Sequence, residues 1–537
     1  MRHIQIVSFV ALIGSAAELR AQATAPAQKL GTVHFQNSCA PGAQASFNRG
    51  VALLHSFEFR RASEGFNATL QADSTCGIAY WGLALSTWGN PFANAIRPDK
   101  QIATGLSFVQ SGRTAGAKTQ REKDYVDAVA ILYENAQPNN QLRRLTSYSE
   151  AMRALADRYP GDTEASIFYG LALAISADPA DKTYANQLKA GTLLENLAKK
   201  YPDHPGLAHY IIHTYDVPPL ASRALHAAHS YSAIAPSLPH ALHMPSHTFT
   251  RVGDWQESID ANLKSTDAAR RDKSGAEELH ASDYLMYAYL QTGQDRSAHE
   301  LLAKIPDIQT RFDPTKPASA APPSAGYFAI AAMPARYALE RGAWHDAAQL
   351  VVEKSPTPYA DAITYFARAL GAARSGDTAT ASASIAELKN IRDDLAKQNE
   401  KYWTEQTEIQ IRAASAWLAF ASGKKDEALA SMREAAERED ATEKSALTPG
   451  PIAPARELLG EMQLEMNQPA EALKNFERKL KVEPRRFRSV ADAAKAAMAT
   501  GNRTAAKKYY AQLIEITARG DKPGREELIA ARKIAGR

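Results

Sequence analysis

A spacing of 34 residues recurs along this chain and constrains its fold more than any other sequence feature. His209 and His243 are 34 residues apart, and Gly342 and Gly376 repeat that offset. This is the length of a tetratricopeptide unit, a helix–turn–helix hairpin that stacks on its neighbours. Other turns are spaced more widely. We therefore predict an irregular array in which residues 34 apart occupy equivalent places in adjacent hairpins.

Hydrophobic periodicity and turn residues both favour helices over strands. Positions 79, 82, 83 and 86 are small or apolar and follow the i, i+3, i+4, i+7 spacing of one helix face. Prolines after polar turns, such as Pro205, suit the first turn of a helix, and glycines such as Gly253 suit its left-handed end. Because strand-like alternation is nearly absent, we predict an all-α solenoid of the tetratricopeptide type.

The N-terminus has the pattern of a secretory signal peptide, with a basic start, an apolar run and the small residues Ala21 and Ala23 at a cleavage site. The run is too short for a membrane-spanning helix, and no later stretch is long and apolar enough. We expect export to the periplasm or the extracellular space, without a transmembrane segment in the mature chain. The predicted organisation is a signal peptide (1–23), a linker (24–36), an N-terminal array with a histidine-rich centre (37–312), a Pro/Ala-rich loop (313–326) and a C-terminal array with a basic tail (327–537).

Charge and cysteine content narrow the classes of function. The net charge of +4 is small for 537 residues and gives no indication of a nucleic-acid partner. Residues 485–537 carry 13 Lys/Arg against 5 Asp/Glu, which we interpret as a solvated helical surface rather than an anion-binding patch. In an exported protein, Cys39 and Cys76 are expected to form one disulfide; the alternative is two buried thiols.

Eight of the 14 histidines fall between His204 and His247. His209 and His213 are four residues apart, as are His243 and His247, so each pair shares a helix face and can bind one cation. The 34-residue offset predicts that the two pairs lie side by side. Four imidazoles would suit Zn, Cu or Ni, and Asp216 is a further candidate, either as a ligand or to orient an imidazole.

Two alternatives weaken the metal hypothesis. The imidazoles could instead hydrogen-bond one another, the backbone and nearby tyrosines between packed repeats. Pro245 also lies inside the second pair: it either kinks a continuous helix or starts a new one. In the second case His243 lies in the preceding turn, and the argument from the spacing of four is weaker.

Several segments together resemble one group of bacterial tetratricopeptide-repeat proteins that are described only by their repeats. The matching segments are residues 47–50, 53–57, 79–82, 334–342, 449–451, 454–458 and, most distinctive, the octet HALHMPSH at 240–247. The resemblance spans nearly the whole mature chain. It implies an exported or cell-envelope solenoid and supplies no activity or catalytic residue.

Two functions remain open from the sequence. The first is a protein- or peptide-binding scaffold whose concave groove is lined by Tyr210, His213, His243, His247, His280 and Asp283. The second is a metal-binding protein or metal-dependent hydrolase that uses His209, His213, Asp216, His243 and His247. The zinc-protease motif H-E-x-x-H, the nucleophile motif G-x-S-x-G and a phosphate-binding glycine loop are all absent from the sequence, so catalysis is unsupported.

Overall fold

The computed structural model describes residues 28–93, 96–316 and 319–535. Within these ranges the chain forms α-helices and three short 3-10 helices, and no strand. This confirms the predicted all-α fold. The predicted signal peptide at 1–23 lies outside the described residues.

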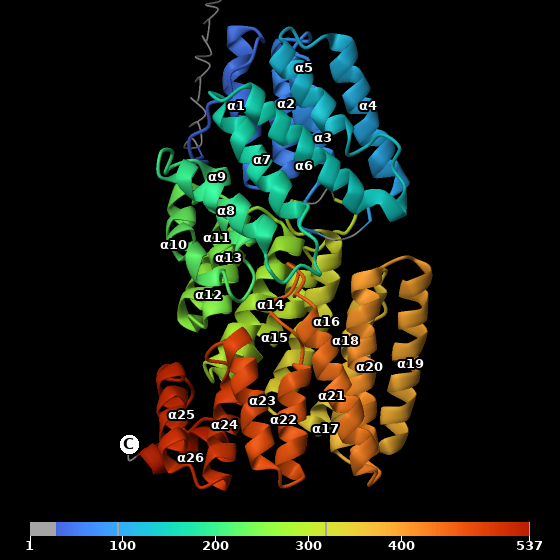
Figure 1. Cartoon of the computed structure of the whole chain (residues 1–537), viewed down its shortest axis with the longest axis vertical. Coiled ribbons are helices and arrows are strands. Elements are labelled where there is room, and N and C mark those ends of the chain that lie inside the picture. The colour runs from blue at the N-terminus through green and yellow to red at the C-terminus, as the bar shows by residue number, and fades with distance from the viewer. Residues whose placement is uncertain (1–27, 94–95, 317–318, 536–537) are drawn as a thin grey trace, which may run out of the picture.

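Helices follow one another as hairpins along the whole chain, and most pack against their neighbours in sequence (Figure 1). The first part contains α1 (Gln44–His55), α2 (Phe59–Ala72), α3 (Ile78–Trp88), α4 (Asp99–Ala115), α5 (Gln120–Ala130), α6 (Gln141–Arg158), α7 (Thr163–Ile175) and α8 (Ala185–Ala198). The middle contains α9 (Pro205–Thr214), α10 (Leu225–Ile234), α11 (Pro239–His243), α12 (Pro245–Val252), α13 (Trp255–Arg271), α14 (Gly275–Gln291) and α15 (Asp295–Gln309).

The last part contains α16 (Pro323–Glu340), α17 (Trp344–Ala348), α18 (Pro358–Arg374), α19 (Thr378–Lys397), α20 (Lys401–Ala421), α21 (Lys425–Ala441), α22 (Ala455–Glu465), α23 (Pro469–Val482), α24 (Phe487–Ala499), α25 (Arg503–Ile516) and α26 (Glu526–Ala535). The three 3-10 helices are η1 (Pro41–Ala43), η2 (Pro138–Asn140) and η3 (Ala221–Ala224). Gly253 and Gly376 end their helices at φ of 78° and 84°, the left-handed conformation expected from their positions in the sequence.

Residues 30–35, in the segment predicted as a linker, contribute side chains to the hydrophobic core. Leu30, Val33 and Phe35 are buried, and the Thr32 amide donates to the Asp203 carbonyl at 2.9 Å. These apolar side chains interrupt the polar sequence that we interpreted as a linker. A disulfide joins Cys39 to Cys76, so the start of the first hairpin is linked covalently to the residues that precede α3.

The C-terminal helices fold back on the middle of the chain. One hydrophobic cluster combines residues from 255–333 with residues from 487–531, and α24 contacts α14. The basic tail contributes to this packing: Arg486, Arg488 and Arg525 pair with acidic residues inside the fold, so these arginines are not solvated side chains.

Two connections reach the centre of the molecule, and we call residues 319–322 and 444–451 the roof segments. The first lies between α15 and α16. Asn90 donates to the Ala320 carbonyl at 3.2 Å, and the Ala321 amide donates to Glu277 Oε1 at 2.8 Å. The second lies between α21 and α22, where Thr448 O accepts a hydrogen bond from the Tyr284 hydroxyl at 3.0 Å. Both segments cover the histidine-rich centre.

Candidate metal centre

Four helices bring six histidines together beneath the roof segments. Helix α9 carries His209 and His213 on one face, and α14 supplies His280. The other three come from the HALHMPSH octet, where His240 and His243 lie on α11 and His247 lies on α12. They form two groups of three whose nitrogens lie within 4.8 Å of one another: His209, His213 and His240 are the first triad, and His243, His247 and His280 are the second triad.

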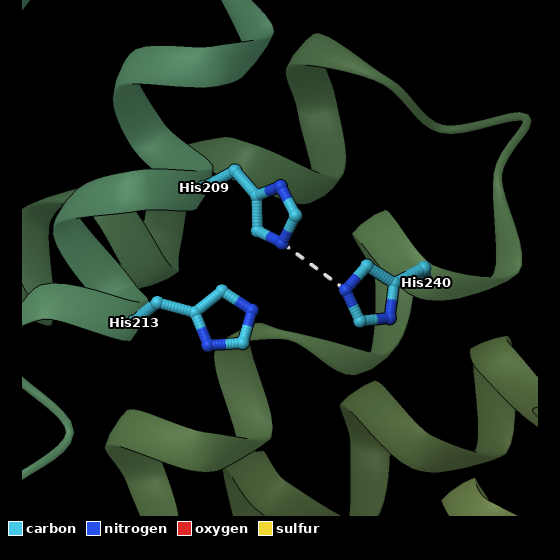
Figure 2. A group of neighbouring side chains, drawn as sticks. All are labelled: His209, His213 and His240. Carbon is cyan, nitrogen blue, oxygen red and sulfur yellow. Dashed lines mark hydrogen bonds between the residues drawn. The ribbon is translucent and has the colours of Figure 1, made fainter. Parts of the chain in front are cut away.

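The first triad points three rings into one space (Figure 2). His209 Nδ1 lies 2.6 Å from the His55 carbonyl oxygen and therefore donates to it, which leaves a lone pair on Nε2. That Nε2 is 3.1 Å from His240 Nε2. His213 Nε2 is buried and has no hydrogen-bond partner. Three imidazole nitrogens thus converge: His209 Nε2 presents a lone pair toward His240, and His213 Nε2 has no hydrogen-bond partner.

The hydrogen bonds of the second triad fix the position of its ring protons. His243 Nδ1 lies 2.7 Å from Asn262 Oδ1, since the Asn262 amide nitrogen donates to the Ser258 carbonyl. His247 Nδ1 lies 2.9 Å from Asp216 Oδ2. Both acceptors are oxygens, so both Nδ1 atoms carry protons and both Nε2 atoms carry lone pairs.

Those two lone pairs face each other. His243 Nε2 and His247 Nε2 are 3.1 Å apart, and two lone pairs at this distance repel unless a cation lies beside both. Nitrogen ligands about 2.0–2.1 Å from a tetrahedral ion lie roughly 3.3 Å apart, which is close to the distance observed. A shared proton is the other cation that could relieve the contact, but burial lowers the pKa of both rings.

The chain around Pro245 combines the two alternatives left open by the sequence. Helix α11 ends at His243 and α12 begins at Pro245, as expected for a proline at the first helical position. However, the residue between them, Met244, is itself helical, with φ −52° and ψ −36°. The helical path therefore continues through the junction, and His243 and His247 stay on one face.

Asp216 orients a ring and lies in neither triad. Its carboxylate accepts from His247 Nδ1, from Arg251 Nε at 2.8 Å and from Lys444 Nζ at 2.7 Å. Burial favours the neutral acid, yet the charges of Lys444 and Arg251 hold the pKa of Asp216 well below its ordinary value. Of the two roles that the sequence suggested for Asp216, the geometry matches the orienting one, and the ring that it orients is that of His247.

The predicted open groove is replaced by a closed chamber. Its expected lining residues are all at least nine-tenths buried, namely Tyr210, His213, His243, His247, His280 and Asp283. The roof segments cause this, because they come from distant parts of the chain and cover the histidines. The chamber has a volume of about 10 Å³ and is lined by His213, His240, His247 and His280, by small or apolar roof residues, and by Asn90 and Ala93.

Two of the expected groove residues serve other contacts. The Tyr210 hydroxyl lies 3.0 Å from His55 Nδ1, and Asp283 pairs with Arg336 at 2.8 Å, where both side chains are buried. Arg336 also donates to Thr448 and to the Gly450 carbonyl, so this ion pair holds a roof segment in place.

Sequence reasoning missed several residues of the centre. His55, Glu164 and His204 form a third cluster in which the Glu164 carboxylate accepts from His55 at 2.8 Å and from His204 at 3.1 Å. Only His204 had a signal, its place in the histidine-rich stretch. Asn262 and Lys444 stand alone in the sequence, and nothing there indicates that they reach the histidines. His226 and His229, which lie outside both triads, are exposed on α10.

A larger cavity opens between the middle of the chain and the C-terminal helices. Its volume is about 390 Å³, and its lining includes Tyr402, Trp403, Gln406, Lys444 and Glu443. Aromatic, amide and charged side chains of both signs make it a better place for an organic ligand or a peptide than the closed chamber.

Comparison with known proteins does not assign the chain to a family. No family model and no curated protein matches the chain. Among solved structures, the human IFIT1 dimer with m7Gppp-AAAA matches at 11% identity and a TM-score of 0.36, covering 87% of this chain and 95% of that one. The Cut9–Hcn1 hetero-tetramer of APC/C matches at 12% identity and a TM-score of 0.32, covering 93% and 96%. These distant likenesses give no information about ligand or partner. In the described part of the chain, no helix has the length and apolar character needed to span a bilayer.

Proposed function

We propose that this chain is an exported solenoid that binds a transition-metal ion at its buried histidine centre. The observation that carries the proposal is the pair of Nε2 lone pairs of His243 and His247, which face each other at 3.1 Å while both Nδ1 protons are bound elsewhere. Ring nitrogens fixed in this way by a carboxylate or an amide oxygen are typical of metal-ligating histidines. All-imidazole coordination suits Zn, Cu or Ni.

Export is supported by the N-terminal sequence pattern and by the Cys39–Cys76 disulfide, which persists in an oxidising compartment. Hydrolysis has less support than binding. Three histidines leave a coordination position for water, but none of the described residues that line the chamber is a carboxylate able to act as general base.

Elemental analysis of the full chain, purified without a histidine tag, tests the proposal. We expect a stoichiometric transition metal in the wild type and the loss of at least one equivalent in the His243→Ala/His247→Ala variant. The exposed His226→Ala variant is the matched control and should keep the wild-type content. Circular dichroism checks that all three proteins are folded. Absence of metal from the wild type would overturn the proposal and direct the search to a peptide in the 390 Å³ cavity.

The charge of Asp216 should contribute to the affinity. Replacing Asp216 by asparagine keeps the shape but weakens the hydrogen bond that orients His247, so we expect the dissociation constant of the metal to rise about 10- to 100-fold. Competition with a chromophoric chelator measures it. Glu195→Gln is the matched control, because Glu195 pairs with Arg223 at the surface. Unchanged affinity in the Asp216→Asn variant would mean that the carboxylate serves only Arg251 and Lys444.

A further inference from the structure

The two triads repeat one arrangement and lie against each other. Each consists of two histidines four apart on a helical path plus a third from another helix. The rings of His213 and His247, which belong to different triads, have centroids 5.8 Å apart, and those of His240 and His243 are 6.2 Å apart. His240 and His243 also share the five residues of α11, so this one turn supplies a ring to each triad.

The chamber lies where the triads meet. Two of its histidines, His213 and His240, belong to the first triad, and the other two, His247 and His280, belong to the second. His213 Nε2 and His280 Nδ1 are buried without a hydrogen-bond partner, one in each triad. The volume of about 10 Å³ is that of one water-sized molecule. A ligand of that size would lie between the two sets of nitrogens.

Charge balance indicates the nature of that ligand. Six neutral imidazoles supply no negative charge, and Asp216 is already matched by Arg251 and Lys444. Glu277 lies 4.0 Å from His240 Nδ1 but does not line the chamber, and it is a single carboxylate beside two proposed divalent ions. Two divalent ions buried here would be costly without an anion beside them. The chamber has room only for a small one.

We propose that the two triads form one two-ion centre, in which each triad holds a transition-metal ion and an anion of the size of hydroxide bridges the ions in the chamber. This rests on the proposed metal-binding function. It goes beyond that function by assigning His240 and His280 as ligands and by naming a class of exogenous ligand, small anions that bind metals.

Refolding the full chain from urea in the presence of Cu(II), so that the ion can enter before the roof segments dock, tests the centre. The wild type should hold two equivalents by elemental analysis, with an electron paramagnetic resonance signal far weaker than two isolated ions give, because the bridge couples their spins. His213→Ala and His280→Ala should each hold one equivalent with a full one-ion signal. Fluoride, an anion of the size of hydroxide, should change the copper absorption spectrum of the wild type by replacing the bridge. His226→Ala should match the wild type throughout.

The results that would contradict the proposal can be told apart from one another. Two equivalents with the full signal of isolated ions would overturn the bridge. One equivalent in the wild type would overturn the two-ion centre and leave metal binding intact. No copper and no zinc in the wild type would overturn the proposed function itself. The wild-type stoichiometry decides between these outcomes even if an alanine variant does not fold, and His280→Gln is a milder replacement for the same comparison.

Discussion

The metal-free protein should lose stability steeply as the pH falls below about 6.5. Burial lowers the pKa of all six triad histidines from the ordinary 6.5, to about 3 for His209 and for His280. The other four shift in the same direction for the same cause: His213, His240, His243 and His247.

The sign of the effect follows from proton uptake. Between pH 6.5 and 3 the unfolded chain binds protons at these rings and the folded chain does not, so the free energy of unfolding falls as the pH falls. Each ring whose pKa in the folded state lies well below the pH lowers the free energy of unfolding by about 1.4 kcal/mol for every pH unit of this fall. Because all six rings shift in the same direction, we expect a net loss of stability between pH 6.5 and 5.5. Glu277 and Glu439 offset part of it, since burial raises the pKa of Glu277 to about 8 and that of Glu439 to about 7.

Urea unfolding of the metal-free chain at a series of pH values measures this dependence. The slope of stability against pH gives the number of protons taken up on unfolding. His243→Gln/His247→Gln should lower that number by about two, whereas His226→Ala should leave it unchanged. Stability that stays constant from pH 7 to pH 5 would contradict the prediction, because it would mean that the rings remain accessible to protons in the folded state. Bound metal should move the transition to lower pH, since it competes with protons for the same nitrogens.

Replacing Arg486 by methionine should lower the free energy of unfolding by about 3–5 kcal/mol. The guanidinium is buried, and it donates to Glu457 at 2.8 Å, to Glu340 at 2.6 Å and to the Tyr287 hydroxyl at 2.8 Å. It therefore connects α14, α16 and α22 at the start of α24. Methionine fills similar space but leaves the buried Glu340 carboxylate without a counter-charge and leaves Glu457 with Arg488, 3.7 Å away, as its cationic partner.

Chemical denaturation at pH 7 measures the Arg486 effect. Arg296→Met is the matched control: Arg296 pairs with Asp521 at 3.2 Å, but its side chain is 76% exposed. Such a pair is worth less than about 1 kcal/mol. The double variant Arg486→Met/Glu457→Met should recover part of the lost free energy of unfolding, because it also removes the buried carboxylate of Glu457. A loss for Arg486→Met no larger than that for Arg296→Met would show that the network contributes little.

The periodicity of the sequence predicted the fold class because helices and hairpin turns depend on local residues. The same register predicted that the histidine pairs of α9 and of the octet would come close, and His213 and His247 do. The register did not predict that each pair joins a third histidine to form a triad, because the third ring lies outside the 34-residue offset. His240 is 31 residues after His209, and His280 is 37 residues after His243. The octet itself contained the signal for His240, which is one helical turn before His243.

Burial of the site could not be predicted from local patterns. The roof segments lie near residues 320 and 447, far from the histidines in sequence, and only the return of the C-terminal helices brings Lys444 to Asp216. A concave groove was therefore the natural expectation for a tetratricopeptide array. What closes it is a set of long-range hydrogen bonds, such as those from Tyr284 and Arg336 to the second roof segment, and these have no sequence period.

The second roof segment also has a consequence for the order of assembly. Residues 444–451 are synthesised about 200 residues after the octet, so a nascent chain can present its histidines while the chamber still lacks that cover. An ion that enters at that stage is enclosed when the later helices dock. Its subsequent release requires the contacts of Lys444 with Asp216 and of Thr448 with Tyr284 to open. If the centre binds a metal ion as proposed, the lifetime of that ion is governed by this opening, and the ions present during folding influence which metal is enclosed.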